Sequence, residues 1–124
     1  MQEYIALPTE KKIEALSVWL REHKAFQLVS LHVAGKSAWT EALIIVSASS
    51  IRHAQSLADG IRTWCKEQKV EFLSMEGYQS GQWILVDLND VIVNIFQTPT
   101  REIYRLEFLW AASPEPVSPQ EVSA

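Results

Sequence analysis

Two neighbouring stretches of the chain, residues 83–88 and 91–96, are apolar except for Asp87 and Asn94, and they lie on either side of Asn89-Asp90. Both stretches are rich in branched apolar and aromatic residues, a pattern typical of strands. Asparagine and aspartate tolerate the left-handed backbone that a two-residue hairpin turn requires. The pattern therefore predicts a β-hairpin in which Leu88 pairs with Val91.

This register divides the hairpin into two chemically different faces, because successive side chains of a strand point to opposite sides. One face carries only branched apolar residues and is predicted to be buried under helices. Its members are Ile84, Val86, Leu88, Val91, Val93 and Ile95. The other face is mixed, with Trp83 opposite Phe96, Leu85 opposite Asn94 and Asp87 opposite Ile92. Mixed faces are more often interfaces than cores, so this face is predicted to meet a partner.

Helical spacing of apolar residues predicts three helices in the rest of the chain. The first begins at a Thr9 cap and ends near His23, and the second begins after Ser49-Ser50 and ends in the charged residues 66–69. The third begins at Thr98-Pro99, because proline is well tolerated at the first helical position. Runs of β-branched and aromatic residues predict three further strands, at residues 26–33, 42–48 and 70–75.

These elements together predict an α+β fold with a mixed sheet of about five strands and helices chiefly on one face. The strand-helix-strand order requires a parallel pair, whereas the hairpin is antiparallel. The single domain is expected to span residues 9–112. A flexible N-terminal arm, residues 1–8, precedes it, and a disordered proline-rich tail, residues 113–124, follows it.

Composition and charge narrow the functional classes that fit the chain. The 124 residues are 48% hydrophobic with a net charge of −4, which suits one globular domain and argues against free nucleic acid, including DNA, as a ligand. Cys65 is the single cysteine, and no apolar run approaches the length of a membrane span. We therefore expect a cytoplasmic protein without membrane contact, whose acidic surface favours a basic protein partner.

The candidate metal and anion sites are weak. His23, His32 and His53 fall on different predicted elements without cysteine or acidic residues at ligand spacing, so neither a metal nor a cofactor is expected. The turn at residues 49–53 offers serine hydroxyls, helix N-terminal amides and Arg52 to an anion. It lacks the glycines and lysine of phosphate loops, and an ordinary capped helix with a partner-facing arginine explains it as well.

Asp87 and Asp90 suggest an enzyme that transfers nucleotidyl groups. A two-metal site for phosphoryl transfer needs carboxylates that converge on the cations. The predicted register places Asp87 on a strand face and Asp90 in the turn, and no Gly-Ser pair precedes them. No catalytic residue is therefore expected, and a small nucleotidyltransferase-like enzyme or nucleotide-binding protein stays as the alternative function.

A series of motifs runs through roughly residues 8–110 in a specific order. It comprises Leu31-His32-Val33, Thr40-Glu41, Ser49-Ser50-Ile51-Arg52-His53, Glu76-Gly77, Trp83, Asp87, Asn89-Asp90-Val91-Ile92-Val93, Phe96, Arg101-Glu102, Tyr104 and Leu106-Glu107-Phe108-Leu109-Trp110. In this order and spacing the motifs resemble the bacterial ribosomal silencing factors, also called the Iojap family. The chain departs from the usual family pattern at His32, Ala42, Ala48 and Asn94.

The resemblance implies a topology similar to that of nucleotidyltransferases, together with a non-enzymatic function. Members of the family bind ribosomal protein fourteen of the large subunit, block an intersubunit bridge, prevent the two subunits from joining and so repress translation. Family members also tend to form homodimers. The resemblance therefore implies the large ribosomal subunit as the partner of this chain.

We predict that the hairpin makes the contact with this partner. The predicted partner-binding residues are Trp83, Leu85, Asp87, Leu88, Asn89, Asp90, Ile92, Asn94 and Phe96. Trp83 is expected to be the anchor, because tryptophan is enriched where binding energy concentrates. Asp87 and Asn94 on the same face argue against its complete burial by the chain's own helices.

Overall fold

The computed structural model describes residues 7–33 and 40–104. The predicted tail at 113–124 and most of the predicted arm lie outside these residues. The elements are α1 (Thr9–Glu22), β1 (Phe26–His32), β2 (Ala42–Ala48), α2 (Ile51–Gln68), β3 (Ser74–Glu76), β4 (Trp83–Asp87), β5 (Val91–Gln97) and α3 (Thr98–Tyr104).

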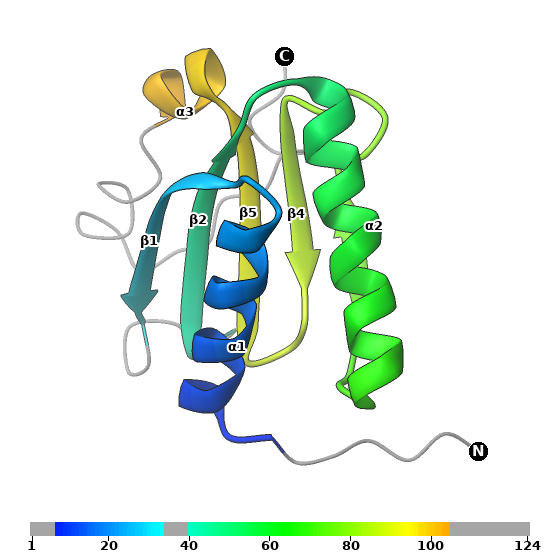
Figure 1. Cartoon of the computed structure of the whole chain (residues 1–124). Coiled ribbons are helices and arrows are strands. Elements are labelled where there is room, and N and C mark those ends of the chain that lie inside the picture. The colour runs from blue at the N-terminus through cyan, green and yellow to red at the C-terminus, as the bar shows by residue number, and fades with distance from the viewer. Residues whose placement is uncertain (1–6, 34–39, 105–124) are drawn as a thin grey trace.

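The five strands form one sheet in the order β1-β2-β5-β4-β3. Strands β2 and β5 are parallel, and the other neighbouring pairs are antiparallel. Helices α1 and α2 lie on the same side of the sheet (Figure 1). The predicted α+β class, the mixed sheet and the placement of these helices are confirmed, whereas the nucleotidyltransferase-like topology stays a prediction.

The hairpin has the register predicted from the sequence. The Leu88 N–H donates to the Val91 carbonyl at 2.9 Å, and Asn89 takes a left-handed φ of 80°. The opposed pairs are Trp83–Phe96, Ile84–Ile95, Leu85–Asn94, Val86–Val93 and Asp87–Ile92. The two-residue turn fixes this pairing, because a slip by one residue would turn every side chain to the other face.

The face of the sheet that α1 and α2 cover, here called the first face, is the main hydrophobic core. Its strand residues are Ala42, Ile44, Val46, Ala48, Ile84, Val86, Leu88, Val91, Val93 and Ile95. The helices contribute Ile13, Leu16, Leu20, Ala54, Leu57, Ala58, Ile61 and Cys65. All six hairpin residues predicted to be core therefore lie in it.

The ends of α2 follow the sequence signals, and the start of α1 does not. Ser50 Oγ accepts a hydrogen bond from the His53 N–H at 3.0 Å, and Lys69 ends α2 in the left-handed conformation. The expected Thr9 cap is wrong, since Pro8 occupies the cap position of α1 without a side-chain bond and Thr9 is already helical. None of the three described helices is long and apolar enough to cross a membrane.

The strand predicted at residues 70–75 is wrong for its first four residues, because β3 contains only Ser74–Glu76. Val70 is buried, and its N–H donates to the Cys65 carbonyl at 2.8 Å, so it belongs to the end of α2. The Arg62 guanidinium stacks over the Phe72 ring at 5.3 Å. These apolar residues pack on the helix instead of continuing a strand.

Candidate protein-binding face of the sheet

The face of the sheet that points away from α1 and α2, here called the second face, consists of three rows across the strands. The row farthest from the hairpin turn contains Trp83, Phe96 and Ser47. The middle row contains Glu76, Leu85, Asn94, Ile45 and Val29. The row next to the turn contains Ser74, Asp87, Ile92, Leu43 and Leu31. Apolar side chains on this face form a second hydrophobic cluster, separate from the main core.

Trp83 lies deeper than its mixed surroundings suggested. Its ring stacks on Phe96 with 4.9 Å between the ring centroids, and its Nε1–H donates to Asn94 Oδ1 at 3.0 Å. Trp83 is only 3% exposed, and Asn94 and Phe96 are buried with it. Trp83 is thus buried although neither α1 nor α2 covers it, because the indole N–H and the amide oxygen satisfy each other and remove much of the cost of leaving water.

The remaining predicted partner-binding residues differ in accessibility. Leu85 and Ile92 keep 9% and 8% of their surface, Asp87 is half-buried, and Asn89 is exposed at the turn. Leu88 is fully buried in the main core between the sheet and the helices, so its predicted contact with a partner stays untested and its burial argues against it. Its side chain belongs to the first face, as the strand alternation requires.

Asp90 holds α1 against the hairpin turn. Its Oδ1 lies 2.5 Å from Lys12 Nζ, and its Oδ2 lies 2.6 Å from the Thr9 hydroxyl. The side chain of Lys12 is only 8% exposed. The sequence carried a signal for this contact, because Lys12 stands four residues before Leu16 and so shares the buried stripe of α1. Asp90 is therefore a structural link as well as a turn residue.

Asp87 has a different partner from Asp90. Its Oδ1 accepts a hydrogen bond from the Asn89 N–H at 2.8 Å, which closes a local turn. The two carboxylates are thus engaged with separate groups and do not converge. Across residues 7–33 and 40–104, no group of three or more His, Cys, Asp or Glu side chains is placed to hold a metal ion.

His53 joins the start of α2 to the end of α1. The Ser49 N–H donates to its Nδ1 at 3.0 Å, which assigns the ring proton of the neutral imidazole to Nε2. That nitrogen lies 2.8 Å from the His23 carbonyl and donates to it. Since the Ser49 amide and the Ser50 hydroxyl are engaged within the turn, the structure favours a capped helix over an anion site.

Arg101 fastens α3 to the edge of the sheet, a role that the sequence did not reveal. Its guanidinium donates to the Gln27 carbonyl at 2.7 Å and to Ser47 Oγ at 2.8 Å. Gln27 lies at the irregularity in β1 and has a left-handed φ of 53°. An arginine in a short amphipathic helix is usually solvated, so the sequence around Arg101 gave no sign of this contact. The only available signal was a serine, Ser47, within an otherwise apolar strand.

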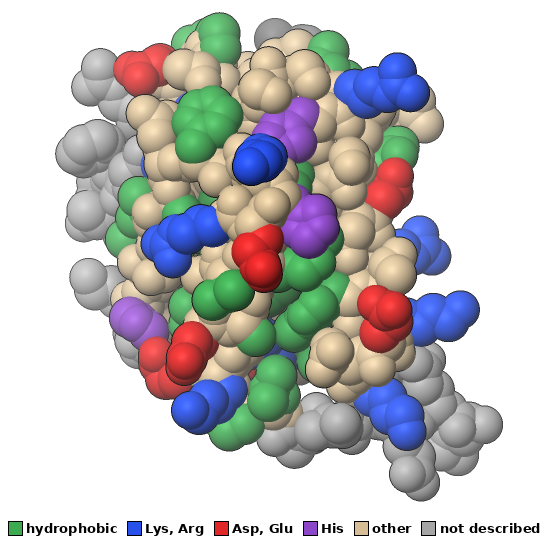
Figure 2. All heavy atoms as spheres, viewed as in Figure 1, with side chains coloured by type: hydrophobic (Ala, Val, Ile, Leu, Met, Phe, Trp, Pro, Cys, Tyr) green, Lys and Arg blue, Asp and Glu red, His purple; other side chains and the backbone are tan. Residues whose placement is uncertain are grey.

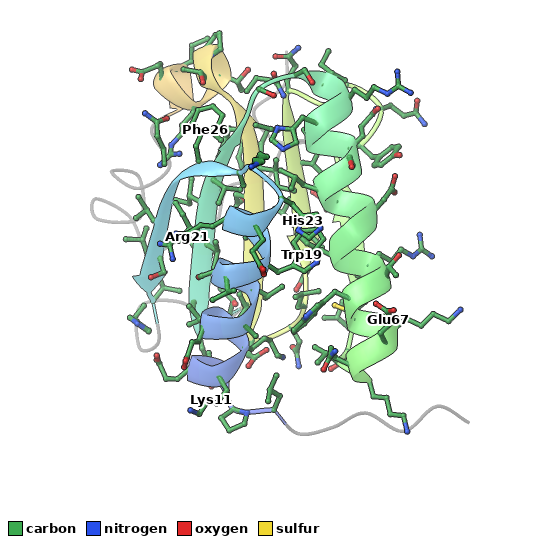
Figure 3. The ribbon with its side chains drawn as sticks, in the orientation of Figure 1. Lys11, Trp19, Arg21, His23, Phe26 and Glu67 are labelled. Atoms are coloured by element: carbon green, nitrogen blue, oxygen red, sulfur yellow. The ribbon has the colours of Figure 1, made fainter. Side chains whose placement is uncertain are left out.

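The side of the molecule formed by α1 and α2 carries no field of one sign. Figure 2 shows Lys and Arg side chains interspersed with Asp and Glu over both helices. Figure 3 places Lys11 and Arg21 on α1 and Glu67 on α2 along this side. Phosphate binding needs clustered positive charge, so this side does not resemble a nucleic-acid interface.

Comparisons with known proteins agree on one family. The family model described as ribosomal silencing factor during starvation matches residues 7–124. A ribosomal silencing factor from Haemophilus influenzae is 39% identical over 99 residues, which cover 80% of this chain and 97% of that protein. A crystal structure of a Chromobacterium violaceum protein has a TM-score of 0.76 at 27% identity, covering 88% of this chain and 91% of that one.

A more distant relative in mouse carries a name that refers to the large ribosomal subunit. This protein, called mitochondrial assembly of ribosomal large subunit protein 1, is 27% identical over 101 residues. The match covers 79% of this chain and 44% of the mouse protein.

Proposed function

Because the chain belongs to the ribosomal silencing factor family, we propose that it docks on the large ribosomal subunit and keeps the small subunit from joining. Its partner there is ribosomal protein fourteen, as the sequence resemblance implies, and it acts in the cytoplasm to repress translation. The mechanism is steric exclusion, which requires no chemistry. A domain about 30 Å across need only stay bound over a subunit bridge to prevent contact.

The proposed contact is the part of the second face next to the hairpin turn. The observation that carries this proposal is a mixed apolar and polar sheet face that neither α1 nor α2 covers. Asp87 and Asn89 offer polar groups there, whereas Leu85 and Ile92 are buried and leave only 9% and 8% of their surface for an apolar contact. Trp83 and Phe96 are buried in the row farthest from the turn, so in this proposal they stiffen the strands that carry the contact instead of inserting into the partner.

Charge supports a basic protein as the partner. The chain has a net charge of −4, and Asp87 stands on the proposed contact surface. Complementary charge speeds association and excludes wrong partners more than it adds affinity. We also propose that the second face serves self-association, so that a homodimer and the ribosome complex compete for it.

Co-sedimentation with isolated ribosomal subunits tests the proposed function. The protein should sediment with large subunits and not with small ones, and should reduce joined ribosomes in a gradient. Asp87→Lys places a positive charge on the second face and should weaken large-subunit binding by about tenfold or more. Lys11→Glu, an exposed change on α1, should leave binding unchanged.

Two results would contradict the proposal. Binding to small subunits, or to neither subunit, would remove the proposed partner. Equal losses from Asp87→Lys and Lys11→Glu, which change the net charge in opposite directions, would show that the contact is not confined to the second face. The thermal midpoint of each variant must stay near that of the wild type for either comparison to count.

A further inference from the structure

Glu76 stands on the second face at the edge of the sheet. Strand β3 pairs with β4 so that Glu76 lies directly opposite Leu85. Opposed residues of an antiparallel pair share a face, so the Glu76 side chain rises beside Leu85, at the end of the middle row. Asp87 stands in the adjacent row of the same face.

The Glu76 carboxylate has an oxygen that is buried without a partner. Its Oε2 is removed from solvent, and within the described residues it has no hydrogen-bond partner. The ion pairs found in these residues use Glu10, Glu14 and Asp90 as the acidic partners, not Glu76. An unsatisfied buried carboxylate oxygen destabilises a folded protein, since the water it has lost is not replaced.

The neighbouring acidic groups do not share this property. Asp87 Oδ1 accepts the Asn89 N–H, and Glu71 Oε1 lies 3.4 Å from the Asn89 side-chain amide. Both groups therefore have a local structural use in the hairpin turn. Glu76 has none, although it lies beside the apolar surface of Leu85 and close in sequence to Leu73, which is 50% exposed.

We propose that Glu76 accepts a cationic side chain of the protein docked on the second face, and that this side chain is an arginine. The inference rests on the proposed function and specifies the chemistry of its partner. A guanidinium can donate two parallel hydrogen bonds to one carboxylate, and it is more weakly hydrated than an ammonium group. The aliphatic part of the arginine side chain packs against Leu85, and its guanidinium donates to Glu76 Oε2. Docking therefore gives a hydrogen-bond partner to the oxygen that has none in the free protein.

Glu76→Gln tests this assignment with two measurements that should move in opposite directions. The substitution keeps the shape of the side chain and removes its charge. Large-subunit binding, measured by co-sedimentation, should weaken by about tenfold or more, because a charge-assisted pair is lost. The thermal midpoint of the free protein should stay equal or rise, because the unsatisfied buried oxygen then belongs to a neutral amide, which costs less to remove from water than a carboxylate.

Glu67→Gln is the matched control, since Glu67 is an exposed glutamate of α2 on the other side of the sheet (Figure 3). It should change neither binding nor stability. Glu76→Lys adds a repulsive charge and should weaken large-subunit binding more than Glu76→Gln does. Raising the salt concentration should narrow the difference between the wild type and Glu76→Gln.

The outcomes separate this inference from the proposed function. If the wild type fails to bind large subunits, the proposed function fails and this inference falls with it. If the wild type binds and Glu76→Gln binds equally well, the proposed function stands and the role of Glu76 is overturned. A clear drop in the thermal midpoint of Glu76→Gln would also overturn it, by showing that the carboxylate supports the fold.

Discussion

For Trp83 on the second face, the sequence predicted the strand pairing but not the burial. The cross-strand pairing of Trp83 with Phe96 followed directly from the turn at Asn89-Asp90 and is present in the structure. The burial of Trp83 could not be predicted, because the sequence does not show that Asn94 would face the indole N–H. Polar residues on a strand face argue for exposure only when they lack partners within the fold.

The Trp83–Asn94 hydrogen bond should couple the two residues energetically. Trp83→Phe keeps an aromatic ring on Phe96 but leaves the buried Asn94 Oδ1 without its donor, so we expect a loss of about 1–3 kcal/mol in unfolding free energy. Adding Asn94→Leu to this variant should cost less than Asn94→Leu costs alone. Urea unfolding of the double-mutant cycle measures the coupling, and strictly additive losses would show that the hydrogen bond contributes nothing.

Burial of Cys65 in the main core should make its thiol inert. Burial raises the pKa of this thiol from 9.0 to about 11, against the opposing effect of the positive charge of Lys12. A thiol reagent at pH 8 should therefore react slowly with the folded protein and quickly in urea. Since the folded pKa lies above the unfolded one, this thiol's contribution to stability is fully present below pH 9.0 and falls as the pH rises through 11.

Rapid labelling of the folded protein at pH 8 would contradict this placement of Cys65. The Cys65→Ala variant supplies the control, because any reaction that remains in it arises from other groups. Its smaller side chain should also leave a cavity and lower stability modestly.

Whole elements were easier to predict where a turn or cap fixed their ends. Ser50 set the start of α2, and the two-residue turn set the hairpin register. The predicted start of β3 was wrong, because Val70 and Phe72 pack on α2 and do not pair with a strand. Periodicity within so short a segment does not distinguish these two kinds of burial.

The contact between α1 and α2 depends on Gly60. A Cβ placed there would meet Cη2 of Trp19 at 2.4 Å, and Trp19 itself stacks on His23 with ring centroids 4.0 Å apart. Figure 3 shows Trp19 reaching from α1 toward α2. Gly60→Ala should gain up to about 1 kcal/mol in helix propensity, but displacement of the tryptophan should make it destabilising overall.

The sign of this effect should reverse when Trp19 is shortened. In a Trp19→Ala background the added methyl group meets no ring, so Gly60→Ala should stabilise the protein by up to about 1 kcal/mol. Thermal unfolding of the four variants provides the comparison. If Gly60→Ala stabilises the protein in both backgrounds, the helices are not in the close contact described.

At the scale of the whole molecule, the two sides of the sheet have different uses. The first face carries the helices and the main core, whereas the second face carries polar groups that include Glu76, Asp87 and Asn94. Sequence alternation predicted this division, and the family comparison supports a ribosomal role for the chain. The accessible part of the second face could not be predicted, because accessibility depends on contacts made by distant segments.

The positions of Asp87 and Asp90 weigh against the nucleotidyltransferase alternative. Asp87 serves the turn through Asn89, and Asp90 points to Lys12 and Thr9 of α1. An enzyme would need both carboxylates to meet at one pair of cations. A chain that instead uses Asp90 to hold a helix should lose stability when that charge is removed.

Asp90→Asn should therefore lower the unfolding free energy by about 3 kcal/mol, because it leaves the ammonium group of Lys12 buried without its counter-charge. Lys12→Met should cost less, since Asp90 is more exposed and keeps the Thr9 hydroxyl as a partner.

Incubation of the wild type with labelled nucleoside triphosphates and magnesium or manganese should give no transfer. Turnover that Asp87→Asn abolishes in a variant that stays folded would establish an enzyme and overturn the binding-protein interpretation.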